Sequence, residues 1–390
     1  MKSSKQGFAL VLTLALLALL VLAVYAVSAL SRLSAQVAAT GGYQAQARQH
    51  ALLGLGAALG ELQRHAGDDD ARTGMAGVAG VPAGAGNPTR HWCGVWSGTG
   101  VFRLWLVSGV DGEAIPPLSS ADSVEIVGDG ALGMDGPDKE HVRVRLVPVE
   151  IVDWHDVRRR YGRYGWWLGD EGVKLSAVLP DTGTPIPSGK HAIDELVPAL
   201  SPMAPDLERV ESFAQLALVP SPMLPPGQLQ SNLHALTRTH GGPLWSGLLN
   251  VNTTSVRFWR GVAATYNRDK PAGDPALVTV GFGTAMRDAG LGLCLEVDDL
   301  LASAPLADAL EHNGGVTPGQ FAGVMHPWLA TRSDTFRIRA YGDAVNAIDP
   351  DRVESVARCE AIVERTGGMV PGFGRRFVMT GFRWLGPDDI

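Results

Sequence analysis

The chain has 390 residues, enough for one large domain or two ordinary domains with a buried core. Charged residues make up 19% against 45% hydrophobic residues, a balance that suggests a membrane segment within the chain. The net charge of −7 is spread along the chain, without the clustered Lys and Arg that nucleic-acid binding requires. We therefore exclude nucleic acid as a partner.

The N-terminal segment is the strongest signal in the sequence. Residues 8–30 carry no charge, and as a helix they span about 35 Å, enough to cross a bilayer. Lys2 and Lys5 precede this run, so the positive-inside rule keeps the N-terminus cytoplasmic and places everything after Leu30 outside. The alternative is a cleaved secretory signal, although the core of such a signal is shorter, about 7 to 15 residues.

A helical stripe continues beyond the apolar run. Gly41 and Gly42 should loosen this helix locally, and the run that begins at Gly67 should end it. The helix from Phe8 to His65 would be nearly 90 Å long, by the rise per residue of an α-helix, and an anchor of that length implies packing against other helices. The stripe recurs at steps of three and four residues: Leu33, Val37, Thr40, Gln44, Ala47, Ala51, Leu55, Ala58 and Leu62.

Alternating patterns predict strands in the body. Residues 142–146 read as a half-buried strand, and residues 336–340 and 357–363 as an antiparallel pair. Residues 164–180 read as two strands joined by a tight hairpin turn at Gly169–Gly172, and residues 375–385 as a last strand.

Between these strand sets the chain changes character. Apolar helical stretches are predicted at 205–218, 253–265, 297–311 and 317–329. Thr253 or Thr254 can cap the second of these helices, and Thr317 followed by Pro318 begins the last. The predicted class is therefore α+β, divided into an N-terminal segment (1–7), a transmembrane and stalk helix (8–66), a first body part (67–180), an inserted helical subdomain (181–333) and C-terminal strands (334–390).

Catalytic motifs are missing from the sequence. The run from Gly54 to Gly60 has the spacing GxGxxxG and lies within the predicted helix, so it indicates close helix packing and not a dinucleotide loop. No GxSxG, HExxH or P-loop occurs. We therefore expect that the chain is not an enzyme.

The histidines and cysteines show no metal-ligand spacing. Surface or hydrogen-bonded roles are expected for the histidines, among them His91, His155, His234 and His240. Cys93, Cys294 and Cys359 lie far apart, which leaves two alternatives: one disulfide with a remaining thiol, or three buried thiols.

Two clusters leave open alternatives. Asp129, Asp135, Asp138 and Glu140 lie in a Gly-rich loop that could wrap calcium, although their spacing is not that of an EF-hand. No other cofactor is indicated. The aromatic cluster Trp154, Tyr161, Tyr164, Trp166 and Trp167 is either core or a partner surface, and strand alternation requires Trp166 and Trp167 to face opposite sides.

The N-terminal residues KQGFALVLTL resemble the type III signal of prepilins. The resemblance implies that a prepilin peptidase cuts after Gly7 and that Phe8 becomes the N-methylated first residue. Most pilins carry a glutamate five residues into the mature chain, whereas Leu12, followed by Thr13, stands there in this sequence. The K class of minor pseudopilins in type II secretion also lacks that glutamate, so the departure favours a minor or tip subunit.

The resemblance extends into the body. GWWLGDEGVKLSAVLPD, LLNVNTTSVRFWRGVAA, DTFRIRAYGDA and GRRFVMTGFRWLGPDDI are similar to segments of K-class pseudopilins and of verrucomicrobial pilin-like cassette proteins. It implies a structural subunit of a type IV pilus-like or type II secretion filament, with other pilins or minor pseudopilins as partners. It also implies a single pass through the bacterial inner membrane, a periplasmic body, and calcium binding there, as in the K class. The alternative is a membrane-anchored binding or enzymatic domain outside any filament.

Overall fold

The computed structural model describes the backbone of residues 4–82, 86–132, 140–152, 158–176, 233–237, 248–346 and 348–390. Side chains are described within these ranges from Val11 onward. The predicted helix at 205–218 and Trp154 lie outside the described residues.

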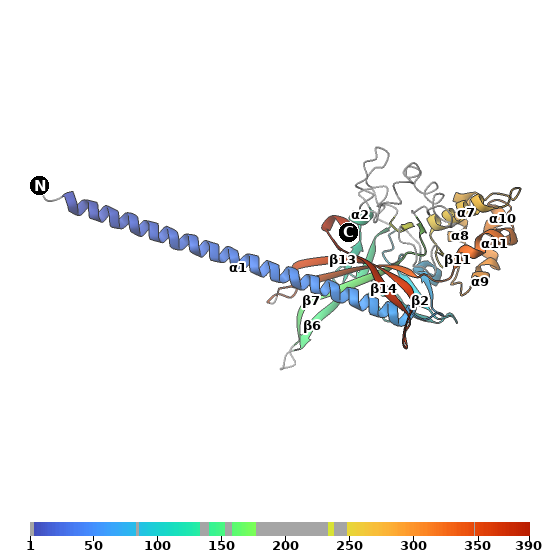
Figure 1. Ribbon diagram of the computed structural model, residues 1–390, viewed down its shortest axis with the longest axis horizontal. Coiled ribbons are helices and arrows are strands. Elements are labelled where there is room, and N and C mark those ends of the chain that lie inside the picture. The colour runs from blue at the N-terminus through green and yellow to red at the C-terminus, as the bar shows by residue number, and fades with distance from the viewer. Residues whose placement is uncertain are drawn as a thin grey trace.

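A long helix, short helices and mainly antiparallel strands make up the described chain, which confirms the predicted α+β class (Figure 1). The α-helices are α1 (Ser4–Ala66), α2 (Asp129–Leu132), α7 (Val256–Asp269), α8 (Thr279–Asp288), α9 (Val297–Leu301), α10 (Ala304–His312) and α11 (Pro318–Met325). The 3-10 turns are η1 (Ala76–Ala79), η4 (His326–Trp328) and η5 (Pro387–Asp389).

The strands are β1 (Arg72–Met75), β2 (Cys93–Trp96), β3 (Phe102–Trp105), β4 (Ser123–Val127), β5 (Val142–Arg145), β6 (Val147–Val152), β7 (Arg158–Asp170), β8 (Leu175–Ser176), β9 (Leu236–Thr237), β10 (Leu249–Asn250), β11 (Leu329–Ala330), β12 (Thr335–Val345), β13 (Val353–Val370) and β14 (Gly374–Leu385). The longest strands are β7, β12, β13 and β14, and the others have six residues or fewer among those described.

Helix α1 is unbroken over 63 residues, and at 1.5 Å per residue it is about 95 Å long. It runs through Gly41 and Gly42 without a break and ends at Ala66, before Gly67, as predicted. Figure 1 shows its N-terminal half projecting away from the body, while its C-terminal half lies along the strands.

The central sheet has the order β14-β13-β12-β7-β6, and every neighbouring pair is antiparallel. The predicted pairing of residues 336–340 with 357–363 is confirmed, with Ile338 opposite Ala361 and Ala340 opposite Cys359. The predicted hairpin at Gly169–Gly172 is wrong. Strand β7 ends at Asp170 between β6 and β12, and β8 pairs in parallel with β9 instead of turning back on β7.

One face of the sheet packs on helix α1. The second half of the predicted stripe is buried here, at Ala47, Ala51, Leu55, Ala58 and Leu62. A Cβ on Gly342 of β12 would lie 2.2 Å from the backbone nitrogen of Ala51. Helix and strand backbones therefore meet at this glycine, and no larger residue fits between them.

The other face of the sheet carries a second core and a network of buried charges. Arg337 lies between Glu171 and Glu360, with N–O distances of 3.1 and 3.0 Å. Lys174 contacts Glu171 at 2.5 Å, and Arg339 contacts Glu360 at 2.8 Å. Glu171 begins a turn, as expected, because its carbonyl accepts from Lys174 N at 3.2 Å. Its side chain is nevertheless buried, and its carboxylate is paired with two cations.

Helices α7 to α11 enclose a further core at the end of the body far from the N-terminus (Figure 1). The predicted capping of α7 by Thr253 or Thr254 is wrong, since Ser255 accepts the backbone N–H of Phe258. Thr317 caps α11 as predicted.

Candidate functional site

The projecting half of α1 is the first candidate functional site. Among the described residues it is the one helix long and apolar enough to cross a membrane, with a mean hydropathy of 2.7 over an 18-residue window. Leu12 is 57% exposed, and Thr13 is exposed beside it. Gly7 and Phe8 lie on the helix backbone, and the processing expected there stays a prediction.

The acidic loop is described at its two ends. Asp129 opens α2, is exposed and lies 3.0 Å from His141 Nε2, and Glu140 precedes β5. Asp135 and Asp138 lie outside the described residues, so the calcium set stays a prediction.

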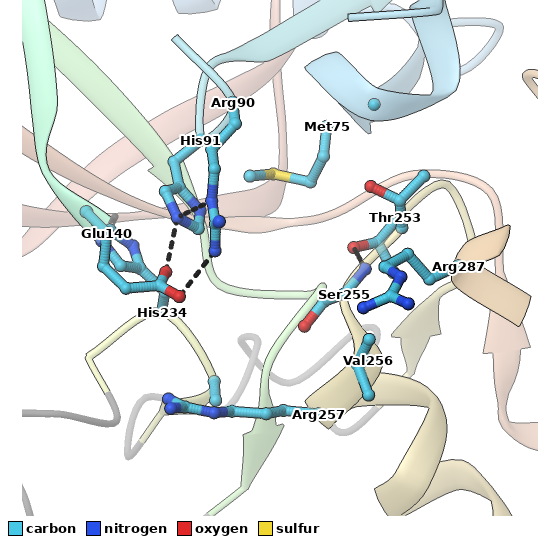
Figure 2. Close-up of a pocket in the computed structure, with 13 residues that line it drawn as sticks. Met75, Arg90, His91, Glu140, His234, Thr253, Ser255, Val256, Arg257 and Arg287 are labelled. Carbon is cyan, nitrogen blue, oxygen red and sulfur yellow. Dashed lines mark hydrogen bonds and ion pairs between the residues drawn. The ribbon is translucent and has the colours of Figure 1, made fainter. Parts of the chain in front are cut away.

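A second candidate site forms where Glu140 meets His91 and His234. One ligand atom of each residue lies within 4.8 Å of the others, which is close enough for a shared metal ion. Each residue stands two positions before the start of a strand: His91 before β2, Glu140 before β5 and His234 before β9. Three remote segments of sequence are therefore held together by the ends of three strands (Figure 2).

Hydrogen bonds fix this cluster. Glu140 Oε2 lies 2.7 Å from His91 Nε2, and Arg90 Nη2 donates to Glu140 Oε1 at 2.6 Å. His234 Nε2 donates to the backbone carbonyl of Glu140 at 2.7 Å. The His91 and His234 rings stack with centroids 3.7 Å apart and planes within 5°.

Trp167 supports both imidazoles from the sheet. Its indole N–H donates to the His91 carbonyl at 2.9 Å, and its ring meets the His234 ring edge to face at 6.2 Å. Trp166 points to the opposite face and packs in the α1 core. The predicted opposite facing is confirmed, and both side chains are core, while Tyr161 is exposed.

Burial sets the charges of the cluster. It lowers the pKa of both His91 and His234, so both rings are neutral near pH 7. For Glu140, burial alone would raise the pKa, but the hydrogen bond from His91 and the charge of Arg90 outweigh it. The pKa of Glu140 falls to about 2, and its carboxyl is ionised at neutral pH.

A cavity of about 250 Å³ opens beside the cluster. Figure 2 shows Arg90, His91, Glu140 and His234 on one side, with Thr253 and Ser255 opposite. Ser255 Oγ accepts from Phe258 N and Thr253 Oγ1 accepts from Ser255 N, so both hydroxyls help to begin α7. The cavity therefore presents two imidazoles and one carboxylate as its metal-ligating groups among the described residues.

Sequence reasoning missed this cluster because positions 91, 140 and 234 share no spacing pattern. Hydrogen-bonded histidines were expected, and this is correct for His91 and His234, but nothing in the sequence indicated that the two rings meet. His155 and His240 lie outside the described residues.

The structure also tests the predictions made for the cysteines and for the glycine run from Gly54 to Gly60. Cys93, Cys294 and Cys359 are buried free thiols, so the disulfide alternative is wrong. Close packing at the glycine run holds for Gly54, whose added Cβ would lie 3.3 Å from the Gly165 carbonyl oxygen. Gly56 and Gly60 face open space, so the packing prediction is wrong for them.

Comparison with known proteins gives one weak likeness. No protein-family model matches the chain, and no curated protein matches it. A chain in the GspK-GspI-GspJ complex of the type 2 secretion system of enterotoxigenic Escherichia coli is similar over 62% of this chain and 83% of its own length. Its sequence identity is 15% and its TM-score 0.32, values too low to assign a family.

Proposed function

We propose that the chain is a structural subunit, a minor pilin or pseudopilin, of a type IV pilus-like or type II secretion filament. The observation that carries this proposal is the division of helix α1. Its N-terminal half projects as an exposed apolar surface, and its C-terminal half packs against one face of an antiparallel sheet (Figure 1). The proposed subunit needs both features, because its helix packs with homologous helices while its body contacts other subunits.

The length of α1 favours a filament over a simple tether. Crossing a bilayer takes about 20 residues, whereas α1 has 63 and does not break between the apolar run and the body. Leu33 and Val37, beyond the predicted span, are 58% and 65% exposed. Apolar side chains on a projecting surface favour burial against partner helices, here those of other pilins or minor pseudopilins.

The proposal includes orientation, processing and place in the filament. Lys2 and Lys5 keep the N-terminus cytoplasmic, the body is periplasmic, and a prepilin peptidase cuts between Gly7 and Phe8. Leu12 provides no carboxylate for the terminal amine of a neighbouring subunit, which supports a minor or tip position. The role is assembly and not catalysis.

The test is the mass of the N-terminal peptide from protein extracted from membranes of the cells that make it naturally. N-methylated Phe8 is the expected result. An intact Met1 would favour an anchored domain outside any filament, and a start beyond Leu30 would mean a released secretory protein.

A Gly7→Glu variant provides the matched control. It should accumulate unprocessed but still insert, because the apolar run from residue 8 is unchanged. Normal processing of this variant would contradict the proposal.

A further inference from the structure

The arrangement of His91, Glu140 and His234 goes beyond a hydrogen-bonded core. We propose that these three side chains bind one divalent transition-metal ion, with Zn²⁺ as the best fit. The donor set of two imidazoles and one carboxylate suits zinc, whereas calcium prefers oxygen ligands alone. This inference does not depend on filament assembly.

The tautomer of His234 is fixed by its partner. The Glu140 backbone carbonyl can only accept, so His234 Nε2 carries the hydrogen, and Nδ1 of the neutral ring keeps the lone pair. A ligating histidine in metal sites ordinarily donates its other ring N–H to a carbonyl or carboxylate in this way. His234 therefore has the outer contact that orients a metal ligand.

Glu140 is held in a similar manner. Arg90 Nη2 binds Oε1 and leaves Oε2 facing His91 Nε2 at 2.7 Å. A ligating carboxylate needs one oxygen for the metal, and a hydrogen bond on the other oxygen sets its direction. Arg90 therefore serves as a positioning residue for monodentate coordination through Oε2.

His91 Nε2 has two neighbours with opposite hydrogen-bonding roles. Glu140 Oε2 at 2.7 Å can only accept, while Arg90 Nε at 2.9 Å can only donate. A proton on Nε2 satisfies the carboxylate but not Arg90, and a lone pair does the reverse. A cation between Nε2 and Oε2 draws lone pairs from both ligands and replaces the proton.

Binding requires two local movements. Arg90 Nε turns away from His91 while Nη2 keeps its hydrogen bond to Glu140 Oε1, and the adjoining cavity, which Arg90 already lines, gives room for this turn. One imidazole also tilts out of the parallel stack, because a metal lies in the plane of each ring that binds it. Three protein ligands then leave a fourth position for water or for a group that enters the cavity.

The metal would connect three parts of the body. It joins the segments that lead into β2, β5 and β9, and β9 pairs with β8 in the chain that follows β7. The ion would therefore cross-link three segments within the body, remote from the projecting half of α1.

The experiment uses the full chain in detergent, with an affinity tag that contains no histidine. After treatment with a chelator, the protein is dialysed against Zn²⁺ and its metal content measured, and Co²⁺ is added to a second sample for absorption spectroscopy. The expected results are one Zn²⁺ per chain and the intense visible bands of tetrahedral Co²⁺, which bound Zn²⁺ abolishes.

Variants locate the ion. His91→Ala, Glu140→Gln and His234→Ala should each weaken Zn²⁺ binding by more than about 100-fold, the upper range for loss of an outer-shell partner alone. His326→Ala is the control, because His326 is a largely exposed histidine outside the cluster and should leave binding unchanged.

The proposal is overturned by a wild-type chain that takes up no Zn²⁺, or by Zn²⁺ uptake and Co²⁺ bands that persist in the three variants. The wild-type measurement stands even if a variant fails to fold. Uptake of Ca²⁺ without Zn²⁺ also overturns it.

Discussion

The two halves of helix α1 share one backbone but present opposite surfaces. The docked half buries the small residues Ala47, Ala51 and Ala58, and the first two lie against Gly342 of the sheet. The projecting half exposes large aliphatic residues such as Leu16, which is 60% exposed. Small residues let two backbones approach closely, whereas large ones provide apolar area for a lipid or a partner helix.

The difference shows that the two halves of one helix meet different surroundings. Stability of the body depends on the docked half, whereas the proposed anchoring and assembly depend on the projecting half. Substitutions of the same chemical kind in the two halves should therefore have different consequences.

The largest effect is expected where helix and sheet backbones meet. Gly342→Val places its Cβ 2.2 Å from Ala51 N and 2.4 Å from Ala47 O, so the helix must move away. We expect a loss of more than about 4 kcal/mol in the free energy of unfolding, a value reached by few single substitutions. Urea denaturation followed by tryptophan fluorescence measures it.

Gly56→Ala is the control for this variant. An added Cβ there meets nothing within 4 Å, so the better helix propensity of alanine should stabilise the protein by about 0.5–1 kcal/mol. Equal losses of unfolding free energy in the two variants would contradict the close contact between Gly342 and helix α1.

The next comparison makes one substitution in both halves. Leu62→Ala removes a fully buried side chain and should cost about 3–4 kcal/mol of body stability, through lost burial and the cavity left behind. Leu16→Ala should leave body stability unchanged within about 0.5 kcal/mol. Denaturant midpoints measure both, and similar losses would show that the two halves are not independent.

Among these tests, a change of pH should have the smallest effect on stability. It should affect the body but not the projecting half of α1. Burial would raise the pKa of Glu171, but Arg337 and Lys174 outweigh it and lower the pKa to about 2. A folded pKa below the unfolded value of 4.5 gives stability that is present above pH 4.5 and is lost as pH falls towards 2. This contribution is about 3 kcal/mol.

Asp170 acts in the opposite direction. Burial raises its pKa to about 6, so its contribution is complete below pH 3.8 and is lost as pH rises through 6. The net loss of stability on acidification is therefore smaller than Glu171 alone would give.

Circular dichroism between pH 7 and pH 2.5 tests these assignments. The chain has no acidic residue before Glu61, so the helix signal of α1 should persist while the near-ultraviolet signal of the body weakens. Glu171→Gln should reduce the dependence of stability on pH. A denaturant midpoint that stays constant over this range would refute the charge network as described.

The sequence predicted local and periodic features well. The stripe from Ala47 to Leu62 predicted the docked face, and the alternation around Ile338 and Ala361 predicted a strand pair, because both signals are repeats within one element. The start of α11 at Thr317 followed from its capping pattern for the same reason.

Features that depend on remote contacts were not predictable. Gly169–Gly172 has turn composition, yet β7 pairs with β12, more than 150 positions away in the chain, and not with the residues after the turn. Glu171 is buried because Arg337 meets it, which no local pattern shows. The same holds for His91 and His234, whose rings meet only through tertiary structure.

The unbroken passage of α1 through Gly41 and Gly42 has a mechanical consequence for the proposed filament subunit. The 16 residues from 31 to 46 place the body about 24 Å beyond the end of the apolar run, at 1.5 Å per residue. Because this segment is a rigid rod fixed to the sheet, an axial push or a twist applied to the anchor moves the whole body with it. In the proposed subunit, the helix therefore transmits force from the membrane to the body as one rigid element, because it has no break at which it could bend.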